Sequence, residues 1–197
     1  MDALQNRVIA GFLCLLIIAV SSVVGVASTL GPMRTQAQRV FYIGEGRSNP
    51  GISVDLNVIL AEAHNVTVIA ERYLGGTTAI VDGQEYSVDN SGVVLVYAVH
   101  EARANLQQAT GPQATYRATQ ELVAATRALR SVLDSTQLSD QDRNLLAGCM
   151  AEIDNRMALL NNNQYNQVAF NFNQALTRFP ANILGPLAGV RPLELFE

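Results

Sequence analysis

Residues 165–197 read YNQVAFNFNQALTRFPANILGPLAGVRPLELFE, and they carry the strongest local pattern in the chain. Apolar residues recur every three to four positions, which is the period of an amphipathic helix, at Val168, Phe172, Leu176 and Phe179. Asn166 and Asn173 are seven positions apart, so they share one face of this helix beside the apolar stripe. Pro180 is expected to end the helix, and an ordered tail is expected to pack behind it.

Upstream, the same apolar stripe continues back to a capping residue. Ser139 is suited to an N-cap, and Asp140 and Asp142 in the first turn favour the helix dipole. The stripe then runs through Leu145, Cys149, Ile153, Met157 and Leu160. The pattern predicts one long final helix from Ser139 to Phe179, weakened at 161–163 because asparagine lowers helix propensity.

Three more helices are predicted before Ser139. The clearest has a stripe with spacings of four and three residues, at Ile52, Leu56, Ile59, Ala63, Val66, Ala70 and Tyr73, and Gly75-Gly76 ends it. The next begins near Val93, and the third follows Thr110-Gly-Pro112. Short loops between such helices favour an antiparallel bundle of the four-helix, coiled-coil-like type.

One segment of this body reads as strand. Residues 77–91 hold two short β-prone runs around Asp82-Gly83, which predicts a small β-hairpin. Inserted loops often carry function, so its polar and aromatic residues are candidates for partner binding: Asp82, Glu85, Tyr86 and Asp89. A tolerated surface insertion is the alternative.

The N-terminal segment Val8–Leu30 carries no charge and is longer than the ~20 residues that cross a bilayer. We expect residues 8–30 to contact lipid, Gly31-Pro32 to break the helix, and residues 31–50 to form a connector. A cleaved signal peptide, with Gly25-Val26-Ala27 as cleavage site, is the alternative. Arg7 on one side and Arg34 and Arg39 on the other leave the positive-inside rule nearly balanced.

Composition excludes some classes of function. The formal net charge is −4, lysine is absent and the arginines are scattered, so no nucleic-acid footprint is expected. The two cysteines, Cys14 and Cys149, lie in different segments, which argues against an internal disulfide. Cys149 falls on the apolar stripe and is expected in the core rather than as a nucleophile.

Candidate chemistry is sparse. The only histidines are His64, near Glu62 and Glu71, and His100, which precedes Glu101. A metal-dependent enzyme would need three or four convergent ligands, and neither HExxH nor a Cys/His spacing is present. No catalytic triad motif or phosphate loop occurs. We therefore expect no enzyme activity and no catalytic, cofactor or metal residues.

The C-terminal sequence resembles the signature of the LemA family, which consists of bacterial membrane-anchored helical proteins. The resemblance lies in Tyr165-Asn166, Phe172-Asn173 and Phe179-Pro180, with Asn182, Ile183 and Phe196-Glu197 in the tail. Asn65, Tyr73 and the pair His100-Glu101 are similar to earlier family positions, although the hairpin separates Tyr73 from His100 and His64 replaces a family proline. The likeness extends over residues 51–197.

The resemblance implies a single-pass protein of the cell (inner) membrane with a cytoplasmic bundle. Its domains would be an anchor (1–30), a connector (31–50) and a helical bundle (51–197). The signature residues would be structural, for example through asparagine amides that bond neighbouring helices or the tail; a polar recognition face is the alternative. The expected function is a non-enzymatic interaction or scaffold role with a protein partner or self-association; a tethered sensor of a small ligand is the alternative.

Overall fold

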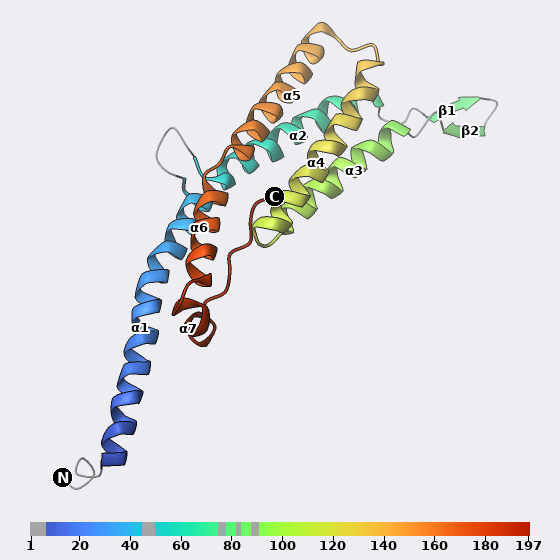
Figure 1. The fold of residues 1–197 in the computed structure, drawn as a ribbon. Coiled ribbons are helices and arrows are strands. Elements are labelled where there is room, and N and C mark those ends of the chain that lie inside the picture. Colours follow the sequence, from blue (N-terminus) through green and yellow to red (C-terminus); the bar gives the residue numbers. More distant parts are fainter. Residues whose placement is uncertain (1–6, 45–49, 75–77, 82–83, 88–90) are drawn as a thin grey trace. The chain divides into compact units, whose positions relative to one another are not determined.

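The structure is a computed structural model that describes residues 7–44, 50–74, 78–81, 84–87 and 91–197 (Figure 1). Its helices are α1 (Arg7–Tyr42), α2 (Ile52–Leu74), α3 (Ser91–Gln108), α4 (Pro112–Asp134), α5 (Asp140–Asn161), α6 (Tyr165–Thr177) and α7 (Ala181–Leu187). The chain forms two compact units. We call Met1–Phe41 with Gln164–Leu195 the terminal unit, and Tyr42–Asn163 with Phe196–Glu197 the bundle unit.

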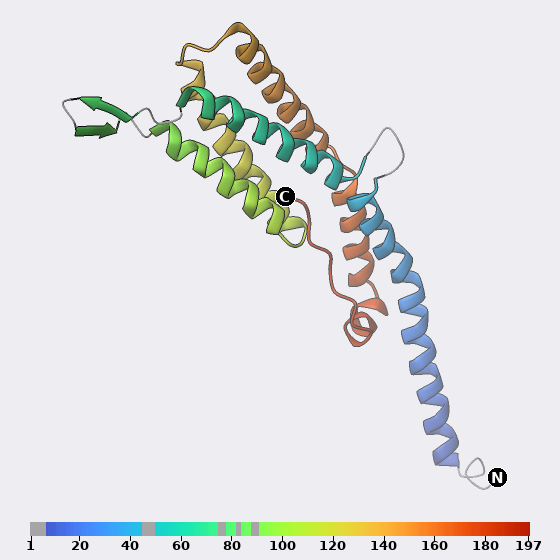
Figure 2. The ribbon, with the colours of Figure 1, turned by 180° about the vertical axis from the view of Figure 1, so that it is seen from behind.

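The bundle unit is built around α2, which packs against α3, α4 and α5, while α3 packs against α4 (Figure 2). The stripe predicted for α2 is confirmed, because its side chains at Ile52, Leu56, Ile59, Ala63, Val66 and Ala70 are buried. The opposite side of this core comes from α4 and α5, through Leu122, Leu129, Leu133, Leu146, Met150 and Ile153. The predicted helical fold is thus confirmed.

The chain's last two residues also belong to the bundle unit. Phe196 is only 4% exposed, and its ring packs edge-on against Tyr116 of α4 with centroids 5.1 Å apart. The aromatic residue next to the C-terminus is therefore part of a hydrophobic core.

The single long final helix predicted from Ser139 is wrong, because the structure has two helices, α5 and α6. Asn162 caps α5, donating its side-chain amide to the carbonyl of Ala158 at 2.9 Å, so the asparagine run ends the helix instead of only weakening it. The predicted stripe also errs at its two ends. Leu145 is 50% exposed and Phe179 is 80% exposed.

The break predicted at Gly31-Pro32 is also wrong, because α1 continues through both residues to Tyr42. Proline removes one helical hydrogen bond, but packing holds the helix on both sides of it. Val26 and Leu30 before Pro32 are buried in one hydrophobic cluster, and Met33 after it packs against the same cluster. Tertiary contacts therefore override the local breaker.

That cluster is the core of the terminal unit. Its partners from the C-terminal segment are Phe172, Leu176 and Ala181, and Phe172 is fully buried. At the other end of α6, Tyr165 packs edge-on against Phe41 of α1, with ring centroids 5.1 Å apart. The helix α6 thus runs antiparallel to α1, and residues 164–195, expected within the bundle, group with the N-terminal helix instead.

Two short strands, β1 (Thr78–Val81) and β2 (Gln84–Ser87), pair antiparallel with Thr78 opposite Ser87 and Val81 opposite Gln84. The predicted turn residues Asp82 and Gly83 lie outside the described residues.

Candidate functional site

The α2–α5 face of the bundle unit carries an open groove of about 670 Å³. Its lining combines one carboxylate and three amides with apolar surface, from Glu62, Asn65, Gln141, Asn144, Leu145, Gly148 and Cys149. Asn65 donates its amide to the Glu62 carboxylate at 3.1 Å. The groove therefore offers hydrogen-bond donors and acceptors beside apolar surface, which suits a small ligand with both polar and apolar parts.

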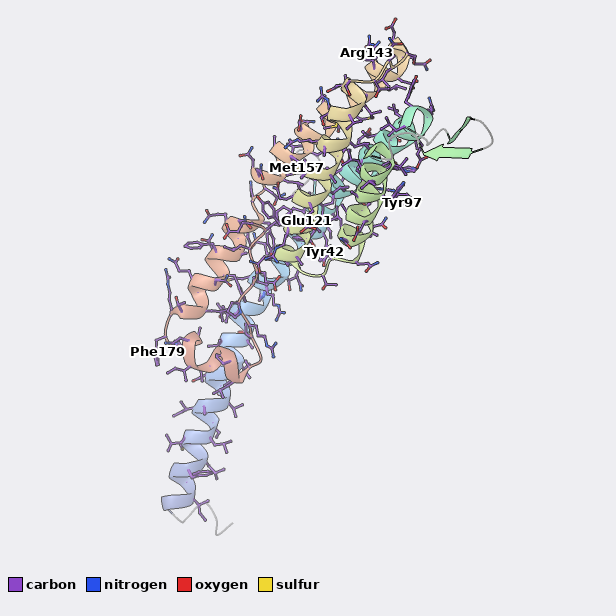
Figure 3. The ribbon with its side chains drawn as sticks, turned by 90° about the vertical axis from the view of Figure 1, so that its right-hand side faces the viewer. Tyr42, Tyr97, Glu121, Arg143, Met157 and Phe179 are labelled. Carbon is purple, nitrogen blue, oxygen red and sulfur yellow. The ribbon has the colours of Figure 1, made fainter. Side chains whose placement is uncertain are left out.

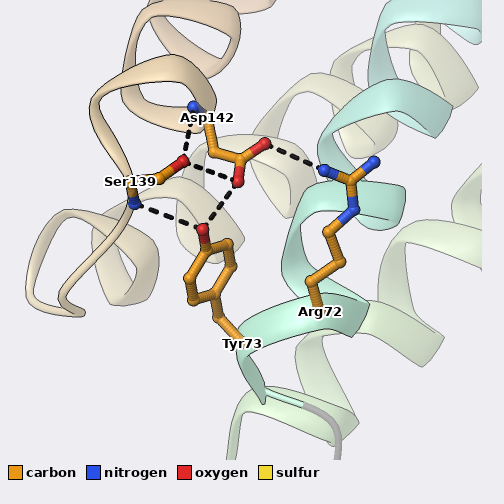
Figure 4. Close-up of polar contacts among 4 residues, drawn as sticks. All are labelled: Arg72, Tyr73, Ser139 and Asp142. Carbon is orange, nitrogen blue, oxygen red and sulfur yellow. Dashed lines mark hydrogen bonds and ion pairs between the residues drawn. The ribbon is translucent and has the colours of Figure 1, made fainter.

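Where α2 ends and α5 begins, four side chains form a polar cluster (Figure 4). Asp142 is 6% exposed, and its carboxylate accepts from the Tyr73 hydroxyl at 2.6 Å, from Ser139 Oγ at 2.9 Å and from the Arg72 guanidinium at 3.0 Å. Ser139 also caps α5, as predicted, by accepting from the Asp142 amide at 3.1 Å. The pKa of Asp142 is lowered, first by Tyr73, then by Ser139 and by the Arg72 charge, against an opposing effect of burial.

We expect Tyr73→Phe to weaken the bundle at neutral pH and to flatten its acid sensitivity. The ionised Asp142 stabilises the fold above its ordinary pKa of 3.8, and this contribution is lost as pH falls through the lowered folded value. The variant lacks the Tyr73 hydroxyl and therefore loses less stability on acidification. The difference in free energy of unfolding between the variant and the native chain should thus become smaller at low pH. Urea unfolding at several pH values checks this. Tyr97→Phe, at a 70% exposed ring, is the matched control and should change nothing.

Farther along the same two helices, a buried carboxylate pairs with an arginine. Asp55 is 1% exposed and accepts from Arg156 Nη1 at 3.0 Å, while Glu152 accepts from Arg156 Nε at 2.6 Å. These two carboxylates raise the pKa of Arg156, Asp55 contributing most. The single local signal for this pair is an aspartate beside the apolar stripe of α2.

Cys149 lies in the groove lining, and its side chain is buried, as its place on the stripe predicted. Burial raises the pKa of its thiol to about 12, and the Glu62 carboxylate, which accepts a hydrogen bond from the thiol, adds to the rise. At neutral pH the thiol therefore stays protonated, and a protonated thiol is a poor nucleophile.

In a Cys14→Ser background, we expect iodoacetamide to modify Cys149 at least ~100-fold more slowly in the folded chain than in urea, because the thiolate fraction drops steeply with a raised pKa. Mass spectrometry of timed samples at about pH 8 measures this. Equal rates in the folded and unfolded chain would identify a reactive cysteine and contradict the core assignment.

In the terminal unit, the signature residues tie α6 to the C-terminal tail. The Asn173 side chain donates to the Leu193 carbonyl and accepts from the Leu193 amide, both at 2.8 Å. Tyr165 is 3% exposed and donates to the Glu194 carbonyl at 2.8 Å. Asn166 is half-buried. The side-chain amide of Asn173 thus satisfies both the backbone carbonyl and the backbone amide of Leu193 in the tail.

The LemA family model matches residues 87–197, more than half of the chain. The chain belongs to the LemA family. No curated protein matches it. No solved structure matches it either. Asn65 and Tyr73, which are similar to earlier family positions, lie before the matched region, whereas His100, Glu101 and the C-terminal signature lie inside it.

The two histidines of this LemA-family chain sit apart from each other. His100 Nε2 lies 3.3 Å from Glu71 Oε1, an exposed pair between α3 and α2, and Glu101 points to solvent. His64 is exposed, and its carbonyl accepts from the Thr67 hydroxyl at 2.7 Å. Within the described ranges, no three metal-ligating side chains converge.

The hairpin candidates for partner binding stay predictions in this LemA-family chain. Asp82 and Asp89 lie outside the described residues, and Glu85 and Tyr86 are placed only as members of β2.

Proposed function

We propose that this chain is a single-pass membrane protein with α1 as its anchor, and that its bundle has an interaction or scaffold role rather than an enzymatic one. The observation that carries the proposal is the exposed apolar surface of α1. Its large apolar side chains lie on all sides of the helix, at Ile9, Phe12, Leu13, Leu15, Leu16, Ile17, Ile18, Val20 and Val24. Such a surface is costly in water and suits a bilayer.

A second helix, α2, is also long and apolar enough to span a membrane. Its most apolar window is 44% buried, against 6% for α1, which is expected of a bundle's core helix. Length and composition alone do not separate an anchor from a signal sequence, but the burial of Val26 and Leu30 against Phe172 favours retention. Cleavage after Ala27 would remove Val26 from that cluster.

The arginines that flank α1 support a bundle on the cytoplasmic side of the inner membrane. Arg7 alone precedes the span, whereas four arginines of the terminal unit follow it, at Arg34, Arg39, Arg178 and Arg191. Positive residues next to a span favour the cytoplasmic side, and anionic lipid attracts them.

The proposed interaction role rests on residues 77–91, which we take as an insertion into the LemA pattern and as the contact for a protein partner. Crosslinking of the full-length protein in intact cells, followed by purification in mild detergent, tests this. A stoichiometric partner that is lost when 77–91 is deleted would support it. Tyr97→Ser, on an exposed α3 ring, is the control variant. Recovery of this chain alone from both proteins would favour self-association.

A tethered sensor is the second candidate, and the groove on the α2–α5 face favours it. Gly148 lies in the lining, and a Cβ there would meet nothing within 4 Å. Gly148→Leu therefore starts from open space and narrows the groove. Ligand-dependent thermal stabilisation that Gly148→Leu abolishes would support a sensor. A null result across a broad panel of small metabolites would remove it.

A further inference from the structure

The short helix α7 and the turn before it have their apolar side chains on the outside. Phe179 is 80% exposed, Ile183 57% and Leu187 74% (Figure 3 labels Phe179 at the turn). Ile183 and Leu187 are four residues apart and share one side of α7. The other side is held by the terminal core: Ala181 is buried, and Leu184 packs against the same cluster. The exposed side chains therefore belong to a helix that is packed on its other side, and not to a loose chain segment.

The position of α7 along α1 indicates where this exposed face lies relative to the bilayer. The cluster that holds α7 includes Val26 and Leu30, and about 20 residues of hydrocarbon span counted from Val8 end near Ala27. The last exposed large apolar side chain of α1 before the cluster is Val24, two residues ahead of Val26. The face of α7 thus continues the apolar surface of α1 at the point where that helix leaves the bilayer.

Three exposed arginines are sequence neighbours of residues in this cluster or on the exposed face. Arg34 follows Met33, Arg178 precedes Phe179, and Arg191 follows Val190. Among the residues that the structure describes, no acidic side chain forms an ion pair with any of them; Arg178 reaches only the Gln174 amide, at 3.4 Å. Cations beside an exposed apolar face are the combination that binds the surface of an anionic leaflet.

We propose that Phe179, Ile183 and Leu187 insert into the headgroup–acyl boundary of an anionic leaflet, with Arg34, Arg178 and Arg191 at lipid phosphates. This rests on the proposed function, since it requires α1 to span the membrane. The terminal unit then meets the bilayer at two places, through a spanning helix and through a shallow contact beside it.

The chain has no tryptophan, so single substitutions give unambiguous fluorescence. We would place full-length Phe179→Trp and Leu187→Trp proteins in nanodiscs containing phosphatidylglycerol and add lipid brominated near the headgroup end of its acyl chains. We expect both to lose half or more of their emission. Tyr42→Trp is the matched control, because Tyr42 is 63% exposed at the end of α1, about 18 Å of helix rise beyond Leu30, and should stay unquenched.

Val20→Trp in the middle of α1 separates the two proposals. Quenching of Val20→Trp by deeply brominated lipid, without quenching at 179 and 187, would overturn this inference and leave the anchor standing. Absence of quenching in Val20→Trp would overturn the proposal that α1 is a membrane anchor. Emission that shifts with the number of copies per disc, and not with bromine, would assign the face to a second copy and also overturn the inference.

The arginines have their own test. In the Leu187→Trp background, Arg178→Gln with Arg191→Gln should reduce the inserted-to-withdrawn ratio about fivefold per arginine in anionic discs. The same variant should show no change in phosphatidylcholine discs. Equal quenching in both lipids before and after the substitution would exclude the proposed phosphate contacts.

Discussion

Replacing Arg156 with methionine is expected to lower the free energy of unfolding of the bundle by about 3 kcal/mol, because the change leaves a buried charge without its partner. Methionine keeps the apolar stem of the side chain, so little packing is lost. Asp55 has a side chain only 2% exposed, whereas Arg156 is 24% exposed and some solvent screening reduces the effect. Pulse proteolysis in urea, on the full-length protein in detergent, measures the loss.

Two further variants test whether the loss of stability is caused by the burial of the Asp55 charge. The Arg127–Asp154 pair is shorter, at 2.6 Å, but both side chains are more than half exposed. Arg127→Met should therefore cost less than ~1 kcal/mol. Asp55→Leu combined with Arg156→Met should recover most of the stability, because the buried charge is gone and only Glu152, which is 35% exposed, loses its partner. If Arg156→Met proves no more harmful than Arg127→Met, the buried pair does not hold α2 to α5.

Phe172→Ala is the second change with a large expected effect, about 3–5 kcal/mol, since truncating a fully buried aromatic side chain leaves a cavity. The loss falls on the terminal unit, where Phe172 contributes to the cluster with Val26, Leu30 and Leu176. We expect α6 and α7 to open far more often and the core of the bundle unit to persist.

Trypsin reports this opening, because Arg178 lies between α6 and α7. Cleavage after Arg178 should accelerate strongly in Phe172→Ala, and amide exchange in α6 should rise with it. Phe170→Ala removes an aromatic ring that is 54% exposed on the same helix and should leave the cleavage rate nearly unchanged. Equal rates in the two variants would mean that α6 is not held through Phe172.

The helices were predictable from sequence where one periodic stripe dominates, as in α2, whose predicted stripe is buried almost residue for residue. The errors came where local and tertiary preferences conflict. Pro32 is a local helix breaker overridden by packing on both sides of it. The low helix propensity of the asparagines at 161–163 predicts only a weak spot, although Asn162 caps α5. No local pattern reveals which of these outcomes holds, because the packing partners are far away in sequence.

The polar sites were less predictable than the helices. Ser139 and Asp142 were correctly placed at a helix start, but the hydroxyl of Tyr73 that lowers the pKa of Asp142 comes from a residue 69 positions away. Asp55 and Arg156 are 101 positions apart. A charged residue inside an apolar stripe was the one available signal, and it indicates a buried partner without identifying it.

The burial of Phe196 has a consequence for the turnover of the protein. A protease such as chymotrypsin must take the aromatic side chain before the cleaved bond into its own pocket. It can therefore cut at Phe196 only after the ring has left Tyr116. Mass spectrometry should find slow cleavage after Phe196 in the folded chain and faster cleavage in Tyr116→Ala. Cleavage at this position would thereby report whether the bundle is folded.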